Sequence, residues 1–252
     1  MTAAGVIRDS EMTLDPSLKG NGEGLVTSLD HAVERCIREA LIAARPEDGF
    51  YGEESAPVAG ESGVEWIVDP IDGTNNLIAG LPHWSISIAA SVCGRVEVGV
   101  VHAPALGWMY GASRGGVVNR GVVNRGGFQA SGPPRPSVAN LHDAVVATGF
   151  ASDPRARAEQ MEQLGRVVGE VRDVRCHGAA SLELCGVACG RLDAYYETGL
   201  RPWDVAAAAL IAIEAGIEVS GQPWSGAGTL IAAVPTLAGP LRCLVDPPGT
   251  HG

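Results

Sequence analysis

Nine residues, WIVDPIDGT from Trp66 to Thr74, place the strongest local constraint on how this chain can fold. The hydrophobic run that begins at Trp66 predicts a strand that delivers Asp69 at its end. Pro70 has no N–H to give to a strand ladder, so we expect the strand to end there. The residues from Asp72 to Thr74 are typical of a turn whose free N–H groups open a short helix. The stretch therefore predicts a corner made of strand, turn and helix.

The same corner carries two aspartates, Asp69 and Asp72, that lie three positions apart. Two carboxylates held 4 Å apart repel by about 4 kcal/mol at an effective dielectric constant near 20, so a close pair requires a cation or a proton. Oxygen ligands suit Mg²⁺ or Mn²⁺, and free backbone amides bind phosphate. By itself, the segment does not distinguish such a site from an ordinary Asp-Gly turn.

Length and charge limit the classes of function. The chain has 252 residues, of which 46% are hydrophobic, enough for one large domain or two small ones. Its 18 basic and 29 acidic residues give a net charge of −11 without a basic stripe, which argues against nucleic acid or anionic membranes as partners. No apolar run approaches the roughly 20 residues of a membrane span, and the first residues do not resemble a signal peptide. We expect a cytoplasmic protein with reduced cysteines.

Hydrophobic spacing predicts a helix from Ser28 to Ala44. Three strand-like runs follow the corner, from His83 to Val92, Arg95 to His102 and Trp108 to Ala112, and they favour an antiparallel sheet. The tandem repeat GVVNRGVVNR, from Gly116 to Arg125, is interpreted as a lengthened hairpin. Its unit is too short for a solenoid.

The stretch SGPPRPS, from Ser131 to Ser137, is the most linker-like part of the chain. We therefore expect an N-terminal α+β lobe at residues 1–130 and a C-terminal α/β lobe at residues 131–252, which together form one catalytic unit. Strand and helix patterns alternate beyond the linker, as in a layered α/β lobe. The expected strands lie at 144–150, 174–176, 192–197, 217–219 and 230–233, and the helices at 156–171, 179–188, 203–215 and from 236.

Acidic residues gather at the ends of these elements in four segments. The segments are LVTSLD (25–30), GEES (52–55), WIVDPIDGTNN (66–76) and YYETGLRPWDVAAAALIAIEAG (195–216). In this order they resemble the inositol monophosphatase superfamily of Mg²⁺-dependent, lithium-sensitive phosphomonoesterases. The resemblance implies an αβαβα sandwich of the sugar-phosphatase type, a homodimer, and two or three Mg²⁺ ions, for which Mn²⁺ is a possible substitute.

The resemblance also assigns metal ligands. It implies that Glu53, Asp69 and the backbone carbonyl of Ile71 bind a first metal ion. Asp69 would bridge to a second ion, which Asp72 and Asp204 also hold. For Asp204, the alternative is a helix N-cap, a common role of aspartate.

Other residues would handle water, phosphate and substrate. The resemblance implies that Thr74 holds the attacking water with Asp30 as its partner, that Glu53 orients this water, and that the N–H groups of Gly73 and Thr74 bind phosphate. Thr74 could instead be a helix cap. The substrate would meet four further residues: Lys19, Gly178, Ala180 and Glu197. Lys19 and Glu197 could instead be solvated surface charges, and the segment before Lys19 looks too short for the usual first helix of the family.

The expected activity is hydrolysis of a phosphate monoester of a small polyol or sugar-like metabolite by a metal-activated water. Alternative substrates are histidinol phosphate, fructose 1,6-bisphosphate, 3′-phosphoadenosine 5′-phosphate or a sugar phosphate of a specialised pathway. An alternative of another class is a non-catalytic regulatory protein that keeps the fold. Phosphate release in the presence of Mg²⁺ separates the two classes.

Overall fold

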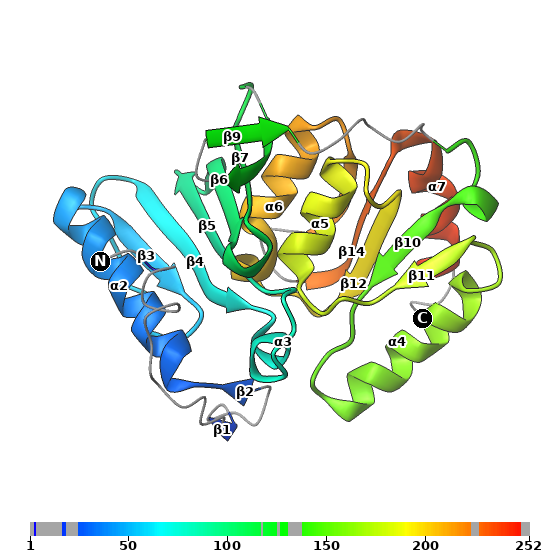
Figure 1. The fold of residues 1–252 in the computed structure, drawn as a ribbon, viewed down its shortest axis with the longest axis horizontal. Helices are drawn as coiled ribbons and strands as arrows, with labels where there is room; N and C mark the ends of the chain where they lie inside the picture. The colour runs from blue at the N-terminus through cyan, green and yellow to red at the C-terminus, as the bar shows by residue number, and fades with distance from the viewer. Residues whose placement is uncertain are drawn as a thin grey trace.

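The computed structural model describes residues 3, 17–18, 25–116, 118–124, 127–130, 138–222 and 227–247. Five layers alternate across the molecule (Figure 1): helix α2, a seven-stranded sheet, helices α5 and α6, a five-stranded sheet, and helices α4 and α7. This arrangement confirms the predicted αβαβα sandwich. The division into lobes at residues 130 and 131 stays a prediction.

The seven-stranded sheet has the order β3-β4-β5-β6-β7-β8-β9. Strand β3 pairs in parallel with β4, and every later pair is antiparallel, as the sequence predicted for the meander. Residues 121–124 of the second GVVNR copy lie in β8, between β7 and β9. The strands are β3 (Gly49–Gly52), β4 (Val64–Asp72), β5 (Ser85–Val92), β6 (Arg95–Ala103), β7 (Trp108–Ser113), β8 (Asn119–Asn124) and β9 (Gly127–Ala130).

The prediction that Pro70 ends the strand is wrong, because β4 continues to Asp72. Asp69 pairs with Ser87 and Asp72 pairs with Ser85, so three steps along β4 match two steps along β5. This irregularity is a β-bulge, one of the places where a strand accepts proline. The bulge lets both aspartates leave the same strand at its end.

Helix α2 (Ser28–Ala44) has the predicted bounds, but its N-cap is Thr27. The Thr27 hydroxyl accepts the N–H of Leu29, and Asp30 accepts the N–H of Thr27 at 2.8 Å. This reciprocal arrangement is a capping box. Leu29, Val33 and Ile37 bury the inner face of the helix. The cap fixes Asp30 at the end of α2 that faces the bulge of β4 and helix α3 (Thr74–Ile78).

The second sheet has the order β11-β10-β12-β14-β13 and is mixed. Strands β11 and β12 run parallel to β10, whereas β14 is antiparallel to both β12 and β13. Its strands are β10 (Val145–Thr148), β11 (Asp173–Arg175), β12 (Ala194–Thr198), β13 (Glu218–Gln222) and β14 (Ala227–Ala233), and the helices beside it are α4 (Pro154–Val167), α5 (Ala180–Ala188), α6 (Pro202–Glu214) and α7 (Pro235–Val245).

Helices α5 and α6 form the middle layer between the two sheets (Figure 1). Alanine-rich α6 lies unusually close to the first sheet: a Cβ placed on Gly99 would come within 2.5 Å of the Ala207 carbonyl oxygen. Small residues permit this approach. The N-termini of α5 and α6 are thereby brought beside the bulge of β4, where the predicted site residues gather.

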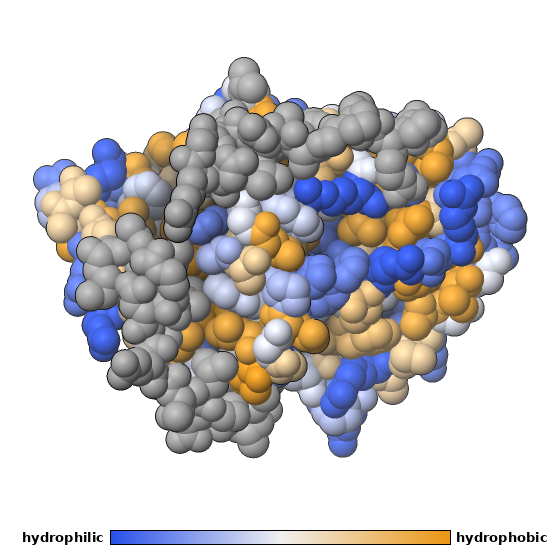
Figure 2. All heavy atoms as spheres, viewed as in Figure 1, coloured by the Kyte–Doolittle hydropathy of each residue, from blue (hydrophilic) through white to orange (hydrophobic). Residues whose placement is uncertain are grey.

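Hydrophobic residues also reach the surface near α3 (Figure 2), where Leu81 is 52% exposed. Smaller strands β1 (Ser17–Leu18) and β2 (Leu25–Val26) pair nearby, and two 3₁₀ turns cover Pro104–Leu106 and Leu141–Asp143. Among the described residues, no helix combines the length and hydropathy needed to cross a bilayer.

Candidate active site

Strand pairing brings Glu53 beside Asp69. The N–H of Glu53 donates to the carbonyl of Val68 at 3.1 Å, which extends the parallel pairing of β3 and β4 by one residue. The carboxyl groups of Glu53 and Asp69 lie within hydrogen-bonding reach. The loop is held from α2 by Glu34, which is 3% exposed and accepts the N–H of Glu54 at 2.8 Å.

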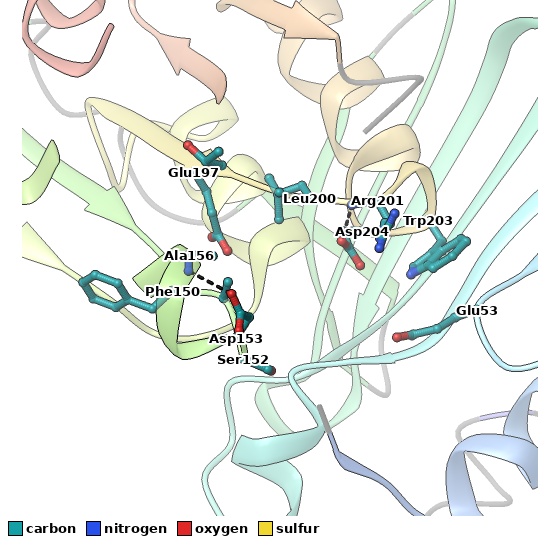
Figure 3. Close-up of a pocket in the computed structure, with 13 residues that line it drawn as sticks. Glu53, Phe150, Ser152, Asp153, Ala156, Glu197, Leu200, Arg201, Trp203 and Asp204 are labelled. Carbon is teal, nitrogen blue, oxygen red and sulfur yellow. Dashed lines mark hydrogen bonds between the residues drawn. The ribbon is translucent and has the colours of Figure 1, made fainter. Parts of the chain in front are cut away.

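Asp204 reaches the same place from the other side of the molecule. It lies in the first turn of α6, and one of its oxygens accepts the N–H of Arg201 at 2.6 Å. The neighbouring Trp203 packs edge-on against Tyr51 of β3, with ring centroids 5.2 Å apart. Figure 3 shows Glu53, Trp203 and Asp204 together at one end of a cavity. The ring contact therefore joins the two segments that carry these acids.

The four predicted carboxylate ligands are electrostatically coupled. Burial raises the pKa of Asp69 well above its usual value, and the charges of Glu53, Asp72 and Asp204 raise it further. Burial and the charge of Glu53 likewise raise the pKa of Asp204. Burial raises the pKa of Asp72 to about 7, although hydrogen bonds from Ser181 oppose the shift. The arrangement brings several carboxylates together where burial weakens their solvation.

The donor chemistry of this cluster fits a hard divalent cation, because its side-chain donors are all carboxylate oxygens. The geometry is less complete: in the described part of the chain, no three His, Cys, Asp or Glu side chains are already arranged around one metal position. Asp72 and Asp204 each turn one oxygen toward a donor of the protein. The metal ligands therefore stay predictions, supported by chemistry and proximity.

Thr74 lies where its predicted role requires. Its hydroxyl is 3.0 Å from Asp30 Oδ1 and 3.0 Å from the carbonyl oxygen of Ile71. Both neighbours are acceptors, so the single hydroxyl proton goes to one of them and the hydroxyl lone pairs remain able to accept. Thr74 thus connects the capped end of α2 with the bulge of β4.

Asn76 is a positioning residue that the sequence analysis missed. Its amide group donates to the carbonyls of His83 and His177, both at 2.6 Å. Gly73 has φ of 92°, and a Cβ there would lie 2.9 Å from the carbonyl oxygen of His83 and 3.2 Å from that of Gly178. The predicted phosphate loop and the predicted substrate turn are therefore packed directly together. The role of Asn76 becomes evident only from the way in which the loop and the turn contact each other in the structure.

Ser181 is a second missed residue. Its N–H and its hydroxyl donate to the same oxygen of Asp72, at 2.8 and 2.5 Å, and the N–H of Ala180 also bonds Asp72. The Ser181 hydroxyl lies 2.7 Å from that of Ser85. Since the Ser181 proton goes to the carboxylate, Ser85 must be the donor in this pair. The chain Ser85–Ser181–Asp72 fixes the orientation of the carboxylate.

Glu197 faces a cavity of about 630 Å³ that opens beside Glu53 and Asp204. The hydroxyl of Tyr195 donates to Glu197 Oε2 at 2.5 Å. A Cβ on Gly149 would lie 1.9 Å from the same oxygen, so a larger residue there would displace the carboxylate. Glu197 is thus held in one orientation. Lys19, the remaining predicted substrate residue, lies outside the described residues, as does nearly all of the segment before it.

Burial raises the pKa of Glu197 from 4.5 to about 7. The folded state keeps this proton longer than the unfolded state, so the contribution of Glu197 to stability falls as the pH rises from about 4.5 to about 7. We expect Glu197→Gln to gain stability relative to the native protein across this interval. Urea unfolding of both proteins between pH 5 and pH 8 measures the difference. An equal difference at both ends would contradict the prediction.

A family model described as the inositol monophosphatase family matches residues 2–241. The chain belongs to the inositol monophosphatase family. An inositol-1-monophosphatase, SuhB, of Mycobacterium tuberculosis is 40% identical over 246 residues, or 94% of this chain and 80% of that protein. A Nus factor SuhB of Escherichia coli is 35% identical over 229 residues, or 88% of this chain and 82% of that protein. The crystal structure of the extragenic suppressor protein suhB of Bartonella henselae superimposes with a TM-score of 0.83 and 31% identity, over 97% of this chain and 94% of that one.

Membership of the inositol monophosphatase family confirms the resemblance seen in the sequence. It supports a phosphatase that acts on a small phosphate ester, in a family that is generally metal-dependent. The name Nus factor, carried by one relative, shows that not every similar protein is named for phosphatase activity.

Proposed function

We propose that this protein is a Mg²⁺-dependent phosphatase that hydrolyses a phosphate monoester of a small polyol or sugar-like metabolite. The observation that supports this most is the convergence of Glu53, Asp69, Asp72 and Asp204 from three separate segments on one cluster. A cluster of this charge is costly unless cations bind it. The cavity beside it is wide enough for a sugar-sized alcohol.

In this proposal each residue has a separate task. Glu53, Asp69, Asp72, Asp204 and the carbonyl of Ile71 would hold two or three Mg²⁺ ions, or Mn²⁺ in their place. When bound, such cations neutralise the phosphate charge and acidify the attacking water. The N–H groups of Gly73 and Thr74 hold the phosphate. The Thr74 hydroxyl would take a proton from the water as it passes its own proton to Asp30, whose Oδ1 lies 3.0 Å away. Gly178, Ala180 and Glu197 contact the alcohol, with Lys19 as a further contact.

The serine chain gives a test of metal positioning. Ser181→Ala removes the hydroxyl that bonds Asp72 but keeps the backbone N–H at 2.8 Å. We expect Mg²⁺ affinity to fall by about 10- to 100-fold, because partners that orient a ligand commonly have this effect. Calorimetric titration of the substrate-free protein with Mg²⁺ measures the change. Ser85→Ala, which leaves the bond to Asp72 intact, is the matched control and should change the affinity much less.

The proposed activity is tested by measuring phosphate release from a panel of phosphorylated metabolites with Mg²⁺, with EDTA, and with Mg²⁺ plus Li⁺. The panel contains myo-inositol 1-phosphate, histidinol phosphate, fructose 1,6-bisphosphate and 3′-phosphoadenosine 5′-phosphate. Release that requires Mg²⁺ and falls with Li⁺ is expected for at least one compound. If no compound of the panel releases phosphate, the proposed activity is wrong.

The second candidate is a regulatory role without catalysis, which is favoured by the Escherichia coli relative named as a Nus factor. Under this alternative the fold would persist while the panel remained unhydrolysed. We also propose a cytoplasmic homodimer, as the family resemblance implies. Light scattering after size-exclusion chromatography would test the dimer.

A further inference from the structure

The cavity beside the carboxylate cluster has walls from two loops. One wall comes from residues 150–153, which lead from β10 to α4, and the other from residues 197–201, at the end of β12 and in its connection to α6. Glu53 and Asp204 close one end. A phosphate at the carboxylate cluster would therefore direct its alcohol group into the space between the two loops (Figure 3).

Acidic side chains outnumber basic ones among the described residues that line this space. Beyond Glu53 and Asp204, the described residues that line the cavity include two acids, Asp153 and Glu197, and one cation, Arg201. Glu197 accepts the hydroxyl of Tyr195 at 2.5 Å, and Gly149 leaves room for its carboxylate. The cavity therefore presents acids to the alcohol part of a substrate.

Asp153 is held in place as the N-cap of α4. One oxygen, Oδ2, accepts the N–H of Ala156 at 2.9 Å, and Oδ1 makes no hydrogen bond within the described part of the chain. On the same helix, Arg157 donates to the carbonyl of Ser152 at 3.2 Å. The cap leaves one carboxylate oxygen of Asp153 available to the cavity.

We propose that Asp153, together with Glu197, selects substrates by the charge of the alcohol group: an alcohol with an amino group is favoured, a neutral polyol is accepted, and an alcohol with a second phosphate is disfavoured. This inference rests on the proposed function, because it takes the carboxylate cluster as the place of the scissile phosphate. Like charges brought together at a binding surface are strongly unfavourable, and opposite charges fix the partner and its register. The bisphosphates among the alternative substrates are thus the poorest match.

Three compounds with the same sugar ring test the inference: glucose 6-phosphate, glucosamine 6-phosphate and glucose 1,6-bisphosphate. Binding to the full chain is measured by calorimetry with Ca²⁺ in place of Mg²⁺ to slow hydrolysis, and free phosphate is assayed after each titration. We expect glucosamine 6-phosphate to bind at least about tenfold more tightly than the bisphosphate, with glucose 6-phosphate between them.

Asp153→Asn is the decisive variant, because asparagine caps a helix as well as aspartate does and only the charge is lost. The substitution should reduce the differences among the three affinities, chiefly because the bisphosphate binds more tightly. Glu159→Gln removes one charge from an exposed position on the same helix and should leave the order and range unchanged. Tighter binding of the bisphosphate by the native chain, or an unchanged range in Asp153→Asn, would overturn the inference.

The two proposals can fail separately. If the three compounds bind in the expected order but no panel compound is hydrolysed with Mg²⁺, the charge selection stands and the phosphatase activity is lost. If phosphate is released but the order is reversed, the activity stands and the charge selection is lost.

Discussion

Replacing Asp69 with asparagine is expected to abolish Mg²⁺-dependent phosphate release and to make the metal-free protein more stable. Asp69 is 2% exposed, and burial together with three neighbouring carboxylates raises its pKa. A neutral amide relieves this repulsion, and its oxygen can still accept the N–H of Ile71, which donates to Asp69 at 2.9 Å. Loss of several kcal/mol of charge stabilisation lowers the rate by about a thousandfold or more.

Two measurements separate the effects. Phosphate release with saturating Mg²⁺ reports activity, and thermal unfolding in EDTA reports the stability of the metal-free fold. Asp204→Asn should behave in the same way, whereas Glu159→Gln should change neither value. A variant at Asp69 that was inactive but less stable in EDTA would indicate a structural role. Retained activity in both the Asp69 and Asp204 variants would eliminate the proposed mechanism.

Local patterns predicted individual helices and strands, whereas the five-layer arrangement was implied only by the family resemblance. Helix α2 has periodic apolar residues between two clear ends, and the meander alternates between glycine and proline breakers. Strand β3 was missed, since its four residues are too few to show a period. The prediction that the strand ends at Pro70 was wrong because strands accept proline at a bulge. Nothing in the local sequence indicated that a bulge forms there.

In the candidate site, too, contacts within one segment were predictable from the sequence and contacts between distant segments were not. Asp69, Asp72 and Thr74 lie within one motif, so their proximity was evident from the sequence. Contacts that join distant segments were not evident from the sequence. One example is the hydrogen bond from Ser181 to Asp72, which are 109 positions apart. Asn76 appeared in the quoted motif, yet its partner His177 lies 101 positions further along the chain. Such pairs depend on how the end of β4 and α3 pack against the residues around the N-terminus of α5, and spacing along the sequence does not predict that packing.

Removing the hydroxyl of Thr74 is expected to have the second large effect. Thr74→Val keeps the shape of the side chain but removes the group that lies 3.0 Å from both Asp30 and the Ile71 carbonyl. General acid–base assistance by a positioned group contributes about 10²- to 10⁴-fold, so we expect kcat to fall within this range while the KM for substrate changes little. Thr74→Ser, which restores the hydroxyl, should recover most of the activity.

Asp30 provides the test of whether Thr74 acts as part of a pair. If the Thr74 hydroxyl passes its proton toward Asp30, then Asp30→Asn and Thr74→Val disable the same step, and the double variant should be no slower than the slower single variant. Independent roles would instead multiply the two losses. Asp30 also caps α2 through Thr27 at 2.6 Å, so part of its loss could come from the helix. Thermal unfolding of each variant distinguishes the two contributions, because a catalytic pair changes kcat without a matching change in stability.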